Sequence, residues 1–189
     1  MKIGYQGIVG SHNENAAMRF LEKMSLSSAE LVPLINSENV ISRLKHNDID
    51  YGIVAVNNSI AGLVIESAEA MKCCLLEAVA YISIPVHQCL FVKDEHVFSQ
   101  DIKAVASHIQ ALSQTKNSLQ VIFKDYKSIV VENTAVAAKM LSNVDIGREV
   151  AVVCSMKAGE DYGLFLLREN IEDYQNNETI FVLLKNPEL

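Results

Sequence analysis

The chain has 189 residues, of which 50% are hydrophobic and 21% are charged, with a formal net charge of −7 and an isoelectric point near 5.2. This composition is typical of a folded globular protein that is long enough to bury a core. Lys and Arg are scattered rather than clustered, which disfavours a nucleic-acid partner. No apolar run reaches the roughly 18 residues of a membrane-spanning helix, which disfavours a membrane protein.

The N-terminal sequence MKIGYQGIVG contains no long apolar block of the kind found in secretory signals, so we expect a cytoplasmic protein. The four cysteines fit neither a disulfide framework nor a zinc pattern with paired spacing. They are Cys73, Cys74, Cys89 and Cys154. We therefore expect reduced, buried thiols and no metal site.

Strand and helix patterns alternate along the chain, beginning with the alternating apolar residues of KIGYQG. The predicted strands span residues 2–7, 29–35, 50–56, 102–108, 127–133, 149–155 and 180–184. The predicted helices span residues 13–24, 37–47, 61–73, 109–119, 134–143 and 156–164. Ser37 is the expected cap of the second helix. This alternation predicts an α/β fold with largely parallel sheets.

The extended segment 75–92 is much longer than a mean strand of about 5–6 residues. This length suggests that the segment crosses between two lobes and that the chain returns to the first lobe near its end. We therefore predict that lobe 1 contains residues 1–76 and 172–189, and that lobe 2 contains residues 77–171.

Small polar groups follow four of the predicted strands, at or just before the start of a helix. They are GIVGSHN (7–13), VNNS (56–59), ASHIQ (106–110) and ENTA (132–135). In open parallel sheets, ligands bind outside the carboxyl ends of the strands, where helix N-termini offer N–H groups to anions. The pattern therefore predicts a site for a small acidic ligand in spite of the negative net charge.

Each polar group also has a purely structural interpretation. Ser11 and Glu14 fit a capping box, while Asn58 with Ser59, or Thr134, can cap the helix that follows. Ser107 and His108 are adjacent on a strand end and point in opposite directions, which argues against a nucleophile and base pair.

Taken in chain order, the segments resemble the prephenate dehydratase family. DYGIVAVNNSIAGLV (50–64) looks like the family signature, and SHIQALSQT (107–115) is similar to its Ser-His-Pro-Gln-Ala-Leu-x-Gln stretch. IPVHQCLFV (84–92) and YGLFLLRENIED (162–173) resemble two further family segments. The resemblance covers nearly the whole chain.

The C-terminal segment resembles the family's Asn-x-Thr-Arg-Phe motif, whose threonine is the residue usually assigned as essential. Here it reads Asn177-Glu178-Thr179-Ile180-Phe181. The threonine is present and the arginine is not. By resemblance that arginine serves the charge of the substrate, so Ile180 is expected to weaken substrate binding.

The resemblance implies two lobes like the halves of periplasmic binding proteins, with the active site in the cleft between them. It implies a lyase that converts prephenate to phenylpyruvate, water and carbon dioxide in L-phenylalanine biosynthesis, without a cofactor. It also implies a homodimer. Because the chain ends at Leu189, we expect no feedback control by phenylalanine from this chain alone.

Thr179 is the expected catalytic residue. The expected substrate-binding residues are Ser11, Asn58, Ser59, Ser107, His108, Gln114, Thr134 and Phe181. Two alternatives stay open because of Ile180: a non-catalytic module that binds small carboxylates, and a related enzyme that decarboxylates prephenate without forming an aromatic ring.

Overall fold

The computed structural model describes residues 1–72, 74–174 and 176–187, and the chain divides into two compact units. Unit 1 comprises Met1–Val86 and Asn176–Leu189, and unit 2 comprises His87–Gln175. The sequence-based division at 76/77 and 171/172 therefore falls too early at both crossings. The extended segment holds two strands, and only the second of them belongs to unit 2.

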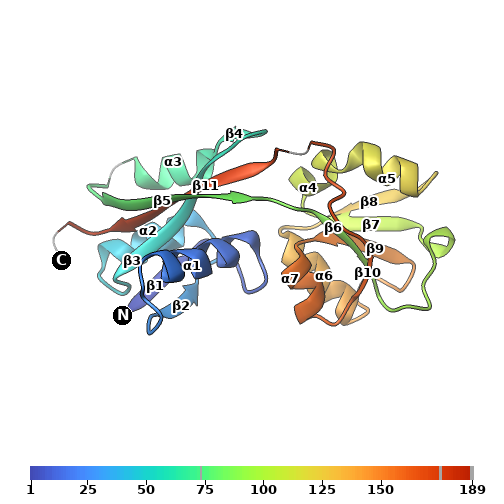
Figure 1. Ribbon diagram of the computed structural model, residues 1–189, viewed down its shortest axis with the longest axis horizontal. Helices are drawn as coiled ribbons and strands as arrows, with labels where there is room; N and C mark the ends of the chain where they lie inside the picture. The colour runs from blue at the N-terminus through green and yellow to red at the C-terminus, as the bar shows by residue number, and fades with distance from the viewer. Residues whose placement is uncertain (73, 175, 188–189) are drawn as a thin grey trace. The chain divides into compact units, whose positions relative to one another are not determined.

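Unit 1 is built around a six-stranded sheet with the order β2-β1-β3-β11-β5, in which β4 also pairs with β3. β1 is parallel to both neighbours, whereas β11 is antiparallel to β3 and β5 and lies between them (Figure 1). Its elements are β1 (Lys2–Tyr5), α1 (His12–Lys23), β2 (Glu30–Pro33), α2 (Ser37–Lys45), β3 (Tyr51–Asn58), β4 (Gly62–Leu63), α3 (Ile65–Met71), β5 (Glu77–Pro85) and β11 (Glu178–Lys185).

The two faces of this sheet have separate cores, and β11 contributes alternate side chains to each. Phe181 packs in the cluster that contains Phe20 of α1. Val182, one residue further along, packs in the cluster that contains Leu44 of α2. The alternation along β11 therefore tells which face of the sheet each of its residues occupies.

Unit 2 contains a five-stranded sheet with the order β10-β6-β9-β7-β8. β8, β7 and β9 are parallel neighbours, while β6 and β10 run antiparallel at the other side. Its elements are β6 (Cys89–Val92), the short 3-10 turn η1 (Ser99–Asp101), β7 (Ala104–Ser107), α4 (Ile109–Gln114), α5 (Lys116–Ile122), β8 (Lys127–Val130), α6 (Thr134–Ser142), β9 (Val150–Cys154), α7 (Met156–Asp161) and β10 (Phe165–Arg168).

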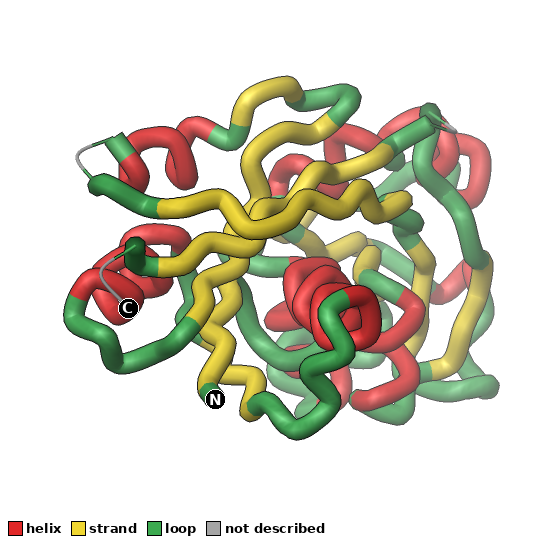
Figure 2. Tube along the Cα trace, turned by 60° about the vertical axis from the view of Figure 1, so that its left-hand side comes forward, coloured by secondary structure: helices red, strands yellow, loops and turns green. Residues whose placement is uncertain are grey.

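The predicted α/β class is confirmed, with helices beside both sheets (Figure 2). Several element ends differ from the prediction. Asn36 rather than Ser37 caps α2, because its side chain accepts a hydrogen bond from the Asn39 N–H. Residues 62–63 pair with β3, so α3 begins only at Ile65. The sequence did not predict β10.

Cys89 and Cys154 are buried and lie directly opposite each other on β6 and β9. Burial is the main cause that raises the pKa of both thiols, which disfavours the reactive thiolate form. Cys74 is only half-buried, and Cys73 lies outside the described residues. The expectation of buried thiols thus holds for Cys89 and Cys154.

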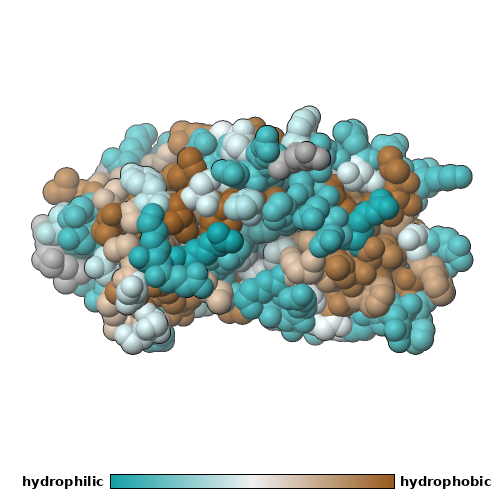
Figure 3. Space-filling model, in the orientation of Figure 1, coloured by the Kyte–Doolittle hydropathy of each residue, from teal (hydrophilic) through white to brown (hydrophobic). Residues whose placement is uncertain are grey.

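Among the described residues, none of the helices is long and apolar enough to cross a membrane. The face shown in Figure 3 mixes hydrophilic and hydrophobic residues, with a hydrophobic area over α7 and β10. Phe165 and Leu166 of the edge strand β10 are exposed.

Candidate functional site

The polar residues of unit 1 gather at one edge of its sheet. Asn58 is the last residue of β3, and Ser11 caps the helix that follows β1. Because β11 is antiparallel to β3, its beginning lies at the same edge, and Thr179 is directly opposite Asn58. Thr179 is 8% exposed and Asn58 is 6% exposed, so both side chains are almost covered by protein.

Asn58 connects two segments that resemble family motifs, the signature segment 50–64 and the C-terminal motif 177–181. Its Nδ2 atom donates to Thr179 Oγ1 at 2.9 Å and to Asn177 Oδ1 at 2.7 Å, across 121 and 119 positions of sequence. Its Oδ1 atom accepts from the N–H groups of Ile60 and Ala61 at 3.1 and 2.9 Å. The signature segment and the C-terminal motif therefore form one hydrogen-bonded unit.

Ser59 strengthens the same connection through both its side chain and its backbone. Its Oγ donates to the Asn176 carbonyl at 2.7 Å and accepts from the Glu178 N–H at 2.9 Å. Its own N–H donates to the Glu178 carbonyl at 2.8 Å. Ser59 was predicted to bind substrate, but its hydroxyl holds the segment that precedes Thr179.

Other residues of the signature have structural roles. The Asp50 carboxylate accepts from the Lys2 N–H at 2.6 Å and fixes the start of β1. A Cβ at Gly52 would lie 2.8 Å from Val40 Cγ1, so only glycine lets α2 pack this closely on β3. Gly62 has φ of +77°, the left-handed region that glycine adopts at little cost.

Ser11 is a helix cap, which its alternative interpretation predicted. Its side chain accepts from the Glu14 N–H at 3.3 Å. Glu14 returns the bond to the Gly10 N–H at 2.8 Å rather than to Ser11. Glu14 also accepts from the Tyr5 hydroxyl at 3.3 Å, and burial followed by this carboxylate raises the pKa of Tyr5.

Phe181 was predicted to bind substrate, and the structure instead makes it a core residue. It is 1% exposed and packs in the cluster with Phe20 of α1. An aromatic ring buried this deeply stabilises the sheet and α1 rather than contacting a ligand.

Ile180 occupies the opposite face of the sheet from Thr179. Thr179 lies opposite Ile84 of β5, which packs in the same cluster as Phe181, so Thr179 and Phe181 share one face and Ile180 lies on the other. The pairing of β11 with β3 shifts register between Ile180 and Phe181, but the pairing with β5 is regular there. Ile180 is 37% exposed and lies opposite Ser83 of β5. An arginine at position 180 would therefore not lie beside the Thr179 hydroxyl. This differs from the expectation, based on the family resemblance, that the arginine serves the charge of the substrate.

In unit 2, Ser107, His108 and Thr134 lie at or just after the carboxyl ends of strands. Ser107 is the last residue of β7, but its hydroxyl is fully buried and donates to the Val153 carbonyl of β9 at 2.6 Å. This bond joins two neighbouring strands inside the sheet. The structure therefore supports a structural role for Ser107 rather than the predicted substrate contact.

His108 and Thr134 are half-buried at the starts of two helices. His108 caps α4, and its Nδ1 accepts from the Gln110 N–H at 3.3 Å, which places the proton of the neutral ring on Nε2. Thr134 is the first residue of α6, whose cap is Asn133 rather than Thr134. Both remain candidates for contact with a ligand.

Gln114 is buried at the end of α4, and the chain returning towards unit 1 is tied to it. Its carbonyl accepts from the Asp173 N–H at 2.7 Å. The Asp173 carboxylate accepts from the N–H groups of Asn117 and Ser118, both at 2.9 Å, at the start of α5. Asp173 is thus a structural anchor that the family resemblance alone did not explain.

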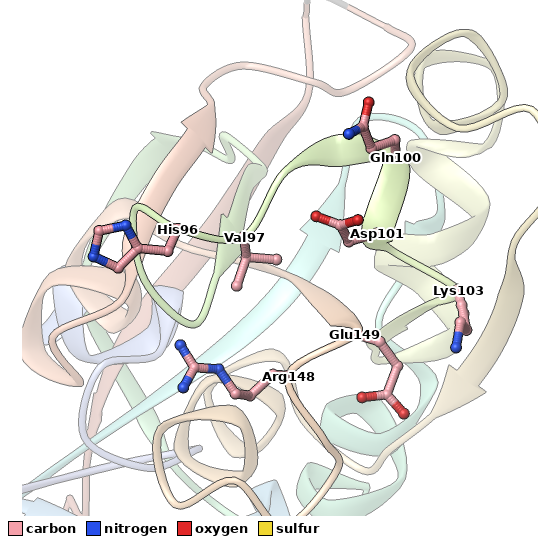
Figure 4. Close-up of a pocket in the computed structure, with 7 residues that line it drawn as sticks. All are labelled: His96, Val97, Gln100, Asp101, Lys103, Arg148 and Glu149. Atoms are coloured by element: carbon pink, nitrogen blue, oxygen red, sulfur yellow. The ribbon is translucent and has the colours of Figure 1, made fainter.

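A separate hollow of about 450 Å³ lies in unit 2 at the amino-terminal ends of β7 and β9 (Figure 4). Lys103 and Glu149, which directly precede these strands, line it together with His96 and Arg148. This is the opposite edge of the sheet from Ser107. None of the predicted site residues lines this hollow, and Arg148 forms an ion pair with Asp94.

No group of three or more His, Cys, Asp or Glu side chains among the described residues is arranged to hold a metal ion. The available chemistry at the unit 1 edge is that of a hydroxyl and two amides. Such groups donate and accept hydrogen bonds and suit a substrate whose reaction needs positioning and polarisation.

The family model for prephenate dehydratase matches residues 3–189 of the chain. The chain belongs to the prephenate dehydratase family. An Arabidopsis thaliana arogenate dehydratase/prephenate dehydratase is 32% identical over 187 residues, which are 97% of this chain and 45% of that protein. The family resemblance read from dispersed motifs is therefore confirmed.

Solved structures agree with membership of the prephenate dehydratase family. The chain is similar to the Staphylococcus aureus prephenate dehydratase, with a TM-score of 0.79 and 27% identity over 100% of this chain and 67% of that chain. The Arthrobacter aurescens prephenate dehydratase has a TM-score of 0.88 at 23% identity, over 99% of this chain and 60% of that chain, which shows the shared fold.

The chain spans less than half the length of the curated relatives that it matches. Sequence reasoning identified Thr179 and Asn58, and the structure joins them. It overlooked Asn177, although the residue stands in the Asn-x-Thr motif. The amide two residues before Thr179, at the first position of that motif, was the signal that could have identified it.

Proposed function

We propose that this protein is a prephenate dehydratase that converts prephenate to phenylpyruvate, water and carbon dioxide. The observation that carries the proposal is the Thr179 hydroxyl, which is nearly buried and accepts a hydrogen bond from Asn58 at 2.9 Å. Family membership identifies the reaction class, and this hydroxyl supplies the group that such a reaction needs.

The reaction removes the ring carboxylate as carbon dioxide, and the electrons of the broken carbon–carbon bond complete the aromatic ring as the ring hydroxyl departs. With one proton taken up, the products are phenylpyruvate, water and carbon dioxide. Hydroxide is a poor leaving group, so a hydrogen bond from Thr179 to the departing oxygen lowers the barrier. Formation of the aromatic ring supplies the driving force.

The residues of unit 2 enter the proposal through their match to the family motif. We propose that His108, Gln114 and Thr134 contribute to substrate binding. His108 and Thr134 follow the carboxyl ends of β7 and β8, where α/β sheets bind ligands, and Gln114 ends the helix that His108 caps. Ser107 supports this region by its bond to β9. Substitution of His108, Gln114 or Thr134 is expected to raise KM.

Purified protein mixed with prephenate tests the proposed function directly. Phenylpyruvate is followed by its absorbance in alkali, and carbon dioxide is measured in the same samples. We expect both products in equal amounts. Saturable binding without product would indicate a binding module, and carbon dioxide without an aromatic product would indicate the decarboxylase.

We also propose a cytoplasmic homodimer that acts in L-phenylalanine biosynthesis, as expected for this family. Light scattering on the purified protein tests the dimer. Cell fractionation tests the compartment, and growth of a phenylalanine auxotroph that carries this chain tests the pathway.

A further inference from the structure

The hydrogen-bonding capacity of the Asn58 side chain is used entirely within the protein. An amide oxygen has two lone pairs and an amide nitrogen has two hydrogens. Both lone pairs are occupied by the N–H groups of Ile60 and Ala61. The two hydrogens face Asn177 Oδ1 at 2.7 Å and Thr179 Oγ1 at 2.9 Å, with the Glu178 carbonyl further away at 3.1 Å.

The orientation of this amide is fixed by its neighbours. A flipped amide would place its NH₂ group against two backbone N–H donors and its oxygen against the oxygens of Asn177 and Thr179. The contacts with the two N–H groups and with Asn177 Oδ1 would then pair like with like, and only the Thr179 hydroxyl could adapt, by donating to the flipped oxygen. The nitrogen of Asn58 must therefore face Thr179.

This orientation determines what the Thr179 hydroxyl can do. A hydroxyl has one hydrogen and two lone pairs, and Asn58 occupies one lone pair. The hydrogen cannot return to Asn58 Nδ2, which has no lone pair to accept it. Among the described residues, no protein group accepts it, so the hydroxyl can donate to a substrate.

We infer that Asn58 is a positioning residue that sets the Thr179 hydroxyl as a donor, and that Asn177 holds Asn58 in this role. This inference rests on the proposed function, and it replaces the expected substrate contact of Asn58. Asn177 is 3% exposed, and its carbonyl accepts from the Val86 N–H at 2.7 Å. The bond from Val86 fixes the backbone of the residue whose side chain accepts from Asn58.

Asn58→Asp tests the inference with the smallest possible change. The carboxylate keeps the bonds to the Ile60 and Ala61 N–H groups, but it offers Thr179 an acceptor in place of a donor. The Thr179 hydroxyl then donates to residue 58 and can no longer donate to the substrate. We expect kcat to fall about a hundredfold, the usual contribution of a positioned acid, with KM within threefold of wild type.

The combination with Thr179→Val separates positioning from other roles. If Asn58 acts through the hydroxyl, Asn58→Asp lowers kcat no further once that hydroxyl is gone. A substrate contact predicts the opposite, because a new carboxylate next to a dianionic substrate raises KM in either background. Additive losses, or a tenfold rise in KM with kcat retained, would overturn the inference. The Glu178 carboxylate, which accepts a hydrogen bond from Ser83 at 2.7 Å, is the same in every variant and so does not cause differences between them.

Asn177 provides a second pair of variants in case Asn58→Asp does not fold. Asn177→Asp retains an acceptor for Asn58 and should lose less kcat than a variant without one. Asn177→Leu removes the acceptor, and we expect kcat to fall at least tenfold with KM unchanged. Equal kcat values for the two variants would contradict the role of Asn177.

The bond itself can be measured without turnover, which separates this inference from the proposed function. Urea unfolding of Asn58→Ala, Thr179→Val and the double variant forms a mutant cycle. We expect the double variant to lose less stability than the sum of the single losses. Additive losses would refute the bond, whereas a wild-type protein that forms no phenylpyruvate would refute only the proposed function.

Discussion

The two units place polar residues at equivalent edges of their sheets but use them differently. In unit 1, Asn58 and Thr179 bond to each other across 121 positions of sequence. In unit 2, Ser107 bonds inward to β9, while His108 and Thr134 stand at the starts of two separate helices. A family motif thus mixes residues that build a site with residues that can touch a substrate.

The difference follows from the strand that completes each sheet. β11 enters the unit 1 sheet between β3 and β5, which brings Thr179 opposite the end of β3. In unit 2, β7 and β9 are direct parallel neighbours, and the buried Ser107 hydroxyl adds a hydrogen bond between them. Substitutions should therefore affect catalysis mainly in unit 1 and stability or binding in unit 2.

Thr179→Val should have the largest effect, because it removes the hydroxyl and keeps the shape of the side chain. We expect kcat to fall about a hundredfold, which corresponds to about 2.7 kcal/mol, with KM nearly unchanged. Thr179→Ser, the matched control, retains the hydroxyl and should keep much of the activity. A Val variant as active as wild type would remove Thr179 from the mechanism.

Ser107→Ala should reverse this pattern and affect stability rather than catalysis. The change leaves the Val153 carbonyl without its buried donor, which costs about 1–3 kcal/mol. For a protein of this size we expect Tm to fall by about 2–4 °C per kcal/mol.

Ser59→Ala in unit 1 is the matched comparison for Ser107→Ala. Its side chain is exposed but holds residues 176 and 178. Ser59→Ala should lower kcat clearly while changing Tm little. Thermal melting and steady-state kinetics on both serine variants would show whether the two units differ in this way, and a loss of kcat in Ser107→Ala alone would contradict it.

His108→Ala and Thr134→Val should each have a smaller effect, confined to KM. Loss of one hydrogen bond to substrate costs about 0.5–1.5 kcal/mol, which corresponds to roughly a 2- to 12-fold rise in KM. Gln110→Ala, at an exposed position of α4, is the control and should leave KM unchanged. Unchanged KM in both test variants would remove unit 2 from the binding proposal.

Local patterns in the sequence predicted much of the fold. Apolar spacing and Ser11 predicted α1, which begins one residue after its cap. The sequence could not assign β5 to unit 1, because membership of a sheet depends on the strand with which a segment pairs, here β11. The sequence did not predict β10 for a related reason, since this strand is short, partly exposed and defined by its pairing with β6.

The candidate site was predictable as a set of residues but not as a set of roles. Family motifs identify Asn58 and Thr179, whereas their contact depends on the register of two distant strands. Phe181 shows the same limit, because only the alternation along β11 and the position of α1 reveal that its ring is buried. Which way a side chain points is a tertiary property.

Ile180→Arg should have the smallest effect of these variants, in contrast to the tenfold gain in binding that the missing family arginine suggests. The side chain at position 180 leaves the sheet on the face opposite Thr179, which lies opposite the core residue Ile84. It lies opposite Ser83, and Glu178 precedes it by two positions on the same face. A partly exposed arginine there would remain hydrated and could pair weakly with Glu178, which is worth about 0–1 kcal/mol. We therefore expect KM for prephenate to stay within twofold of wild type and Tm to stay equal or rise slightly.

The KM of Ile180→Arg separates two interpretations of position 180, because one predicts a large fall in KM and the other predicts no change. If the arginine serves the substrate's charge, restoring it lowers KM by tenfold or more, about 1.4 kcal/mol. If the strand alternation determines its direction, KM does not respond. Ile180→Gln is the control for side-chain length without charge. A tenfold fall in KM for the Arg variant alone would show that substrate binding reaches the Ile180 face, and the separation of Ile180 from the site would then be wrong.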